Sequence, residues 1–239
     1  MAFDALKFFL PDHPVLTRIW RGPFRGARIA MNPRNSLRKI LGLYEHELND
    51  WIEQALRRVT RVLDVGANDG YFTFGCAAAF RRLGKAGEII AFEPQANQVA
   101  LLRESLAASA IAGVGDPSKA VRVEIVQALV GRESKPEMIT LDSVGAPLPD
   151  PTNKTNTLVK IDVDGPEVDV IQGGRSWLNS SNPFVIEVHE ERFLDQLRAM
   201  FMENNLRLLQ VNQRPIPLLG REMRPKNNWW LVSDLGAHR

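Results

Sequence analysis

Residues able to bind a polar ligand follow a buried strand that the sequence predicts over Arg61–Val65. The loop from Asp64 to Gly70 reads Asp-Val-Gly-Ala-Asn-Asp-Gly. Its two glycines allow a tight turn and the close approach of a ligand that a Cβ would obstruct. Glu93 ends the next predicted strand, close to the ~20-residue offset at which a carboxylate accepts ribose hydroxyls in nucleotide-binding folds. This arrangement predicts a nucleotide-cofactor site.

The glycine spacing and the charge of the loop distinguish between candidate cofactors. The dinucleotide fingerprint G-x-G-x-x-G requires a glycine spacing that Gly66 and Gly70 do not supply. Asp64 and Asp69 would repel a pyrophosphate but suit the ammonium and sulfonium groups of S-adenosylmethionine. We therefore expect S-adenosylmethionine, with an NAD-dependent oxidoreductase as the less favoured alternative. The expected contacts come from Asp64, Gly66, Ala67, Asn68, Gly70, Glu93 and Pro94.

Candidates for acceptor chemistry stand at the ends of two later predicted strands. Methyl transfer from a sulfonium to a hydroxyl needs in-line alignment and removal of the hydroxyl proton, so a base or a metal is required. His189 is the best single base, because its intrinsic pKa is near ~6.5 and neighbouring carboxylates can raise it. Asp162 and Asp164 complete the expected catalytic set. The alternative for His189 is a structural hydrogen bond to a neighbouring strand end.

A metal is the second way to activate the acceptor hydroxyl. Asp162, Asp164 and Glu187 could form an oxygen-rich Mg²⁺ site, since hard cations favour carboxylates. We expect no metal and keep this Mg²⁺ site as the alternative. Glu167 stands at a predicted helix start, where an acid complements free backbone N–H groups, so we expect it to cap its own helix, a role that does not exclude one in the active site.

Strands and helices alternate around these residues. Strands are predicted over residues 61–65, 88–92, 121–130, 158–163, 184–188, 206–211 and 229–232, and helices over 44–58, 71–83, 97–110, 191–204 and a short stretch ending near 173–174. Such alternation predicts a doubly wound α/β fold with a mostly parallel seven-stranded sheet covered on both faces. The last two strands have no helix between them, so we expect a hairpin that makes one strand antiparallel.

The ordered blocks around these elements resemble the FkbM family of methyltransferases. The matching blocks are Leu63 to Gly70, Phe92-Glu93-Pro94, Thr140 to Ser143, Leu158 to Glu167, Gly173-Gly174 and Pro183 to His189. The chain departs from the family at Asp164, where Glu is common, and at Pro166, where Ala is frequent. The resemblance implies a class I methyltransferase sheet, S-adenosylmethionine as donor and, usually, transfer to a hydroxyl of a sugar, polyketide or similar metabolite.

The N-terminal segment differs in charge from the rest of the chain. Residues 1–40 hold eight Lys/Arg against Asp4 and Asp12. Prolines and glycines interrupt any long helix there, while apolar residues remain available to pack. We therefore expect a basic, helical arm or lid over residues 1–43 and a class I methyltransferase domain over residues 44–239. The arm either binds an anionic partner or forms a solvated surface.

The composition of the chain indicates the cellular compartment in which it works. The single cysteine, Cys76, excludes an intramolecular disulfide and favours a reducing compartment, so we expect a cytoplasmic protein. No apolar run approaches the ~20 residues that span a bilayer.

The Asp/Asn-Pro-Pro-aromatic motif of nitrogen-directed nucleic-acid methyltransferases is absent after residues 158–163. We expect a small-molecule hydroxyl acceptor, anionic or glycosylated, and no nucleic acid. The rival is a non-catalytic module that docks through the basic arm, and the oligomeric state is not predicted.

Overall fold

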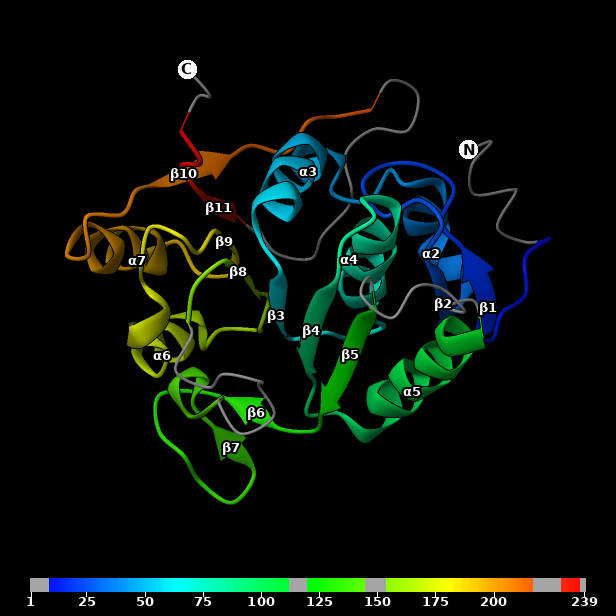
Figure 1. The fold of residues 1–239 in the computed structure, drawn as a ribbon, viewed down its shortest axis with the longest axis horizontal. Helices are drawn as coiled ribbons and strands as arrows, with labels where there is room; N and C mark the ends of the chain where they lie inside the picture. The colour runs from blue at the N-terminus through cyan, green and yellow to red at the C-terminus, as the bar shows by residue number, and fades with distance from the viewer. Residues whose placement is uncertain (1–8, 112–119, 145–153, 217–228, 237–239) are drawn as a thin grey trace.

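The computed structural model describes residues 9–111, 120–144, 154–216 and 229–236, and its centre is a seven-stranded sheet (Figure 1). In spatial order the strands are β10 (Leu208–Val211), β11 (Trp229–Ser233), β9 (Phe184–Val188), β8 (Thr157–Ile161), β3 (Arg61–Val65), β4 (Gly87–Phe92) and β5 (Val121–Val126). The five strands from β9 to β5 run parallel, and β11 is antiparallel to both of its neighbours. The predicted sheet and its C-terminal hairpin are confirmed.

Helices cover both faces of the sheet because its central strands are apolar on both sides. One face carries α3 (Asn49–Arg58), α4 (Tyr71–Arg82) and α5 (Ala96–Ile111), and the other carries α6 (Glu167–Gln172) and α7 (Arg192–Met202). Successive residues of β3, such as Val62 and Leu63, belong to different cores, as the two-residue period of a strand requires. Because β4 and β8 lie on opposite sides of β3, the strand order reverses there, and a crevice for ligands is expected at the carboxyl ends.

The strand predicted over residues 121–130 is wrong as a single element. β5 ends at Val126, and Leu129–Val130 forms β6, which pairs with β7 (Met138–Ile139) in a separate small sheet. Val130 is buried in the core on the α6 and α7 face. The apolar run at 121–130 therefore reflects burial at two places and not one continuous strand.

The N-terminal arm contains a β-hairpin in addition to a helix. β1 (Val15–Arg18) pairs antiparallel with β2 (Arg28–Met31), and α2 (Pro33–Leu41) follows. The backbone N–H of Ala30 donates to Ser105 Oγ of α5 at 2.9 Å, and Phe24 is buried in the same core as α4. The arm is thus docked on the α4 and α5 face, at the right of Figure 1. The boundary at residues 43 and 44 stays a prediction.

Two further predicted segments are the helix that leads into β3 and the connection between β10 and β11. The helix predicted over 44–58 begins as a 3-10 turn at His46–Leu48 before α3 starts. Most of the Pro-rich connection between β10 and β11, residues 217–228, lies outside the described residues. Among the helices that the structure describes, none is long and apolar enough to cross a membrane.

Candidate active site

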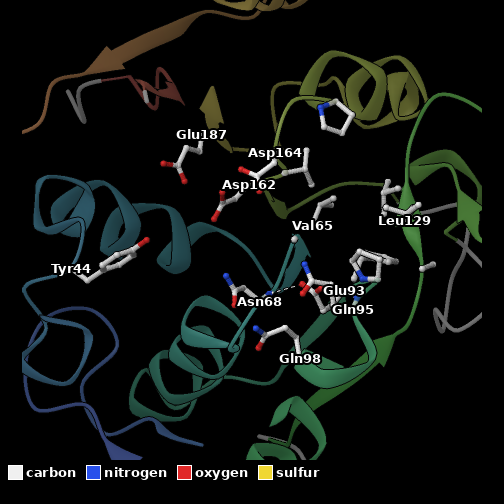
Figure 2. A pocket seen from close by; sticks show the side chains of 17 residues that line it. Tyr44, Val65, Asn68, Glu93, Gln95, Gln98, Leu129, Asp162, Asp164 and Glu187 are labelled. Carbon is white, nitrogen blue, oxygen red and sulfur yellow. Dashed lines mark hydrogen bonds between the residues drawn. The ribbon is translucent and has the colours of Figure 1, made fainter. Parts of the chain in front are cut away.

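A cavity of about 550 Å³ opens at the carboxyl ends of β3, β4 and β8, where the strand order reverses. Figure 2 shows two groups of polar side chains around it. Asn68, Glu93 and Gln95 lie on one side, and the carboxylates of Asp162 and Glu187 lie on the other. The cavity therefore joins the predicted cofactor loop to the predicted catalytic residues.

Four of the seven predicted cofactor residues line this cavity, namely Gly66, Asn68, Glu93 and Pro94. Gly66 has a φ of 80°, and a Cβ there would lie 1.9 Å from the backbone oxygen of Asp162, so only glycine lets the loop touch the end of β8. Ala67 and Gly70 do not line the cavity but shape the loop. Ala67 N–H donates to the backbone oxygen of Phe92 at 3.0 Å, and Gly70, with a φ of 82°, precedes α4.

Glu93 orders the loop and faces the cavity. It is 5% exposed, and its two carboxylate oxygens accept the backbone N–H groups of Asn68 at 2.8 Å and Gln95 at 2.9 Å. An ionised carboxylate offers about four lone-pair sites, so both oxygens can still accept hydroxyl donors. This geometry fits the pair of hydroxyls on a ribose.

Asp64 is fully buried beneath the loop and does not line the cavity. It accepts a hydrogen bond from Thr73 Oγ1 at 2.5 Å, and Lys160 Nζ lies 3.2 Å from its other oxygen. Lys160 Nζ also lies 3.1 Å from Asp162 and donates to the backbone oxygen of Gly66 at 3.0 Å. Burial raises the pKa of Asp64 above its usual value, and Lys160 opposes that shift. Asp64 therefore supports the loop from below, and its expected contact with the cofactor stays a prediction.

Lys160 remains charged in this position. Burial alone would lower the pKa of Lys160, but the carboxylates of Asp162 and Asp64 outweigh burial and raise it. For Asp162, burial alone would raise the pKa, whereas the Lys160 ammonium and the hydrogen bonds lower it. One buried ammonium thus joins β3, the loop and the end of β8.

Asp69, the second acid of the loop, is paired with a residue of the arm. Lys39 Nζ lies 2.6 Å from Asp69 Oδ2, and also 4.9 Å and 5.6 Å from the ring centroids of Tyr44 and Tyr71. The other oxygen of Asp69 accepts the Tyr71 backbone N–H at 3.2 Å. Both loop acids are therefore neutralised by lysines. The acids that line the cavity are Glu93, Asp162, Asp164 and Glu187, and of these Asp162 also lies 3.1 Å from Lys160 Nζ.

His189 follows β9 and is held by a buried carboxylate. Its Nδ1 lies 2.6 Å from Glu167 Oε1, and the same oxygen accepts the His189 backbone N–H at 3.1 Å. Glu167 stands in the first turn of α6, as expected, and its carboxylate also orients the imidazole. Burial alone would lower the pKa of His189, but Glu167, with help from Asp162 and Asp164, raises it above its ordinary value. Nε2 is left as the nitrogen that can accept a proton.

The three predicted catalytic residues lie together at the edge of the cavity. Asp162 and Asp164 line it, whereas His189 lies next to them, with its side chain 8% exposed, and is not a lining residue. Asp164 Oδ1 is 3.4 Å from His189 Nε2, and the Asp164 side chain is 96% exposed. Ligand atoms of Asp162 and Glu187 lie within 4.8 Å of each other, and a hydrogen bond with Glu187 is one of the causes that lower the pKa of Asp162.

The residues present do not fit the Mg²⁺ site considered from the sequence. Ligand atoms of Asp162, Glu187 and His189 lie within 4.8 Å of one another, so a histidine stands where Asp164 was expected. Mg²⁺ prefers an all-oxygen shell. Lys160 Nζ, 3.1 Å from Asp162, already supplies a positive charge to this carboxylate. We therefore derive no catalytic step through a metal.

Other lining residues were not singled out from the sequence, including Tyr44, Gln95, Gln98 and Leu129. Gln95 follows Glu93 by two residues, so its position after β4 could have indicated it. Tyr44, in the segment that follows α2, and Leu129 of β6 reach the cavity through long-range packing, for which the sequence has no local signal.

The parallel sheet, the reversal at β3 and the loop over its carboxyl end define the Rossmann-like fold of class I methyltransferases. The family description "Methyltransferase FkbM domain" matches residues 64–209, which is more than half of the chain. The chain therefore belongs to the FkbM methyltransferase family, and membership supports S-adenosylmethionine as its methyl donor. Among curated proteins, none matches the sequence significantly.

Two solved structures are similar to this chain in fold. Methyltransferase FkbM from Methylobacillus flagellatus KT has 16% identity and a TM-score of 0.55, covering 74% of this chain and 44% of that one. The METTL16 MTase domain has 12% identity and a TM-score of 0.53, covering 99% and 92% respectively. The chain thus spans less than half the length of the first of these proteins. At such identities the similarity concerns the fold alone.

Proposed function

We propose that the chain transfers a methyl group from S-adenosylmethionine to a hydroxyl oxygen of a neutral polyhydroxy molecule, such as a sugar or a glycosylated metabolite. The proposal rests on one observation above all. A single cavity is lined by the Gly66 loop, Glu93 and Asp164, and Asp164 lies 3.4 Å from the histidine that Glu167 orients. The first feature suits a nucleoside, and the second suits removal of a proton.

The donor half of the cavity would hold S-adenosylmethionine through its ribose and its charge. Glu93 would accept the ribose hydroxyls, since both of its oxygens retain lone pairs. Gly66 and Asn68 would lie against the methionine part. The acids Asp162 and Glu187, across the cavity in Figure 2, would attract the sulfonium and ammonium groups.

The same charges favour a neutral acceptor. Among the described residues that line the cavity, none is a lysine or arginine, while Glu93, Asp162, Asp164 and Glu187 are acidic. These acids would repel an anionic acceptor, so the anionic option weighed from the sequence is not part of the proposal. Hydroxyl groups of a sugar can donate to these carboxylates.

His189 would act as the general base. Bound S-adenosylmethionine would supply the electrophilic methyl carbon. His189 would take the acceptor's hydroxyl proton at Nε2, because Nδ1 is held by Glu167. The raised pKa of His189 makes the neutral imidazole a stronger base than an unperturbed histidine.

The His189→Ala variant tests this function. We expect donor affinity, measured by calorimetry with S-adenosylmethionine, to stay nearly unchanged. Turnover, measured with labelled donor and a panel of neutral glycosides, should fall by roughly two to four decades, the usual range for loss of a general base. Wild-type turnover should survive EDTA.

Three results would contradict the proposal. Absence of donor binding to the wild type at millimolar concentration would favour a non-catalytic module. Loss of donor affinity in His189→Ala would give His189 a structural role. Inactivation of the wild type by EDTA, reversed by a divalent cation, would replace the base with a metal.

A further inference from the structure

A basic groove lies at the end of α4 that is remote from the cavity. Its volume is about 670 Å³, and it is lined by Arg18 of β1, Arg25 of the hairpin loop, and Arg81 and Arg82 of α4. Within the described part of the chain, no acidic side chain lines it. α4 has 12 residues and begins beside the cofactor loop, so a rise of 1.5 Å per residue places the groove roughly 17 Å from that loop.

The four arginines differ in how they are partnered. Arg82 donates to two backbone carbonyls of the arm, at 2.7 Å and 3.1 Å, and Arg25 lies 3.7 Å from Glu53. The guanidinium groups of Arg18 and Arg81 have neither a hydrogen bond nor an ion pair with any described residue. Burial, and next the charge of Arg25, lower the pKa of Arg82. An anion in the groove would relieve this repulsion and pair with the two unpartnered groups.

Exposed apolar side chains flank the same arginines. Trp20, which is 66% exposed, lines the groove, and Leu16 is 45% exposed. Residues two apart in a strand share a face, so Leu16 and Arg18 point to the same side of β1, and Trp20 follows two residues after the strand ends. Phe9, on the same arm, is 86% exposed.

This combination of groups suits a lipid surface better than a nucleic acid. At a bilayer interface, tryptophan sits at the level of the headgroups, leucine and phenylalanine enter the acyl region, and arginines pair with anionic headgroups. A nucleic acid could use the arginines and stack a base on Trp20. It would leave the exposed Leu16 without a role.

We propose that the groove, with Leu16 and Trp20 beside it, docks the protein on an anionic lipid surface through the phosphates and carboxylates of the headgroups. Docking at this end of α4 leaves the methyl-transfer cavity away from the bilayer. The proposal stands on the arm and on α4, so it is independent of the function proposed for the cavity.

Vesicle sedimentation with the full chain tests the proposal. The wild type should bind vesicles of phosphatidylcholine with 30% phosphatidylserine and should not bind pure phosphatidylcholine, and binding should weaken as salt rises. An arginine near an anionic surface contributes about 1 kcal/mol, so Arg18→Gln with Arg81→Gln should lower the partition coefficient about 30-fold. Trp20→Ala should weaken the binding that persists at high salt.

A matched control distinguishes the effect of the groove arginines on vesicle binding from the effect of net charge. Arg103→Gln with Arg175→Gln removes two exposed arginines elsewhere and should change the partition coefficient less than threefold. Donor affinity should stay the same in every variant, which shows that each is folded. The proposal is overturned if the wild type does not prefer anionic vesicles or if the control variant loses as much binding. It is also overturned if the groove variant instead loses affinity for a single-stranded oligonucleotide in fluorescence anisotropy.

Discussion

Lys160 places one ammonium between two carboxylates that come from neighbouring strands. It lies 3.2 Å from Asp64 and 3.1 Å from Asp162, and it donates to the backbone oxygen of Gly66. Asp64 is fully buried, so its charge has no access to water. Removing the ammonium would leave that charge buried without compensation, a change that typically costs more than the ion pair contributes.

We predict that Lys160→Met lowers the free energy of unfolding by about 3–5 kcal/mol, because it leaves Asp64 unpaired in the core. Urea denaturation followed by circular dichroism measures the change. The double variant with Asp64→Asn removes the orphaned charge and should recover part of the loss. A loss below about 1 kcal/mol in the single variant would mean that water reaches Asp64 and that the pair is not a buried one.

Glu167 controls the proton affinity of His189 in the proposed reaction. A histidine is a base only when neutral, so its raised pKa should place the rising limb of the kcat–pH profile at a midpoint above ~6.5. Glu167→Gln removes the charge that raises the pKa and should move the midpoint to lower pH. The measurement is kcat of both proteins from about pH 5 to about pH 9, a range that includes the ordinary pKa of histidine. An unchanged midpoint would show that His189 does not limit the reaction.

Sequence patterns identify some of these residues more readily than their roles. The spacing of Gly66, Asn68 and Glu93 predicted residues that line the cavity. The acids of the loop predict contacts with a cation, yet Asp64 and Asp69 are paired with Lys160 and Lys39. Both lysines come from distant parts of the chain, so no local pattern shows that the acids are neutralised.

At the scale of elements, local periodicity predicted the central βα units well and the connections poorly. Four of the five parallel strands match their predicted bounds within two residues, because each is a short, largely apolar run bounded by polar residues or glycine. The structure divides the strand predicted over 121–130 into β5 and β6, because Val130 is buried in the core on the α6 and α7 face. The hairpin of β1 and β2 was missed because its strands have only four residues each, and burial against α5 stabilises them.

The pairing of α2 with the cofactor loop leads to a prediction about the donor. Lys39 of α2 lies 2.6 Å from Asp69 and both side chains are 16% exposed, so the pair is only weakly screened by solvent. We predict that Lys39→Met raises the Kd for S-adenosylmethionine about fivefold, a loss of about 1 kcal/mol, because Asp69 would no longer hold the loop. Isothermal calorimetry measures this Kd.

A matched control for this prediction lies on the same helix. Arg34 pairs with Asp12 at 2.9 Å, away from the cofactor loop and more exposed than Lys39. Arg34→Met should leave the Kd within twofold of the wild type. If both variants weaken donor binding equally, α2 contributes through its general packing and not through the contact with Asp69.

At the scale of the whole molecule, the arm and the domain share a core. Phe24 of the arm is 2% exposed and makes edge-to-face contacts with Tyr71 and Phe72 of α4 at ring-centroid distances of 5.1 Å and 5.4 Å. A Cβ on Gly75 would lie 2.3 Å from the Phe24 ring, so the glycine is what lets the arm approach α4. The helix that begins at the cofactor loop is therefore covered by the arm.

We predict that Phe24→Ala destabilises the whole protein by about 3–5 kcal/mol, the usual cost of emptying a buried phenylalanine site. Because the arm and α4 belong to one core, urea denaturation should remain a single transition, with far-ultraviolet circular dichroism and tryptophan fluorescence changing together. Phe80→Ala, at a fully buried site in the same core but outside the arm, should shift the same transition by a similar amount. Two separate transitions, with Phe24→Ala moving only the earlier one, would show that the arm is an independent unit and would support a domain boundary near residue 43.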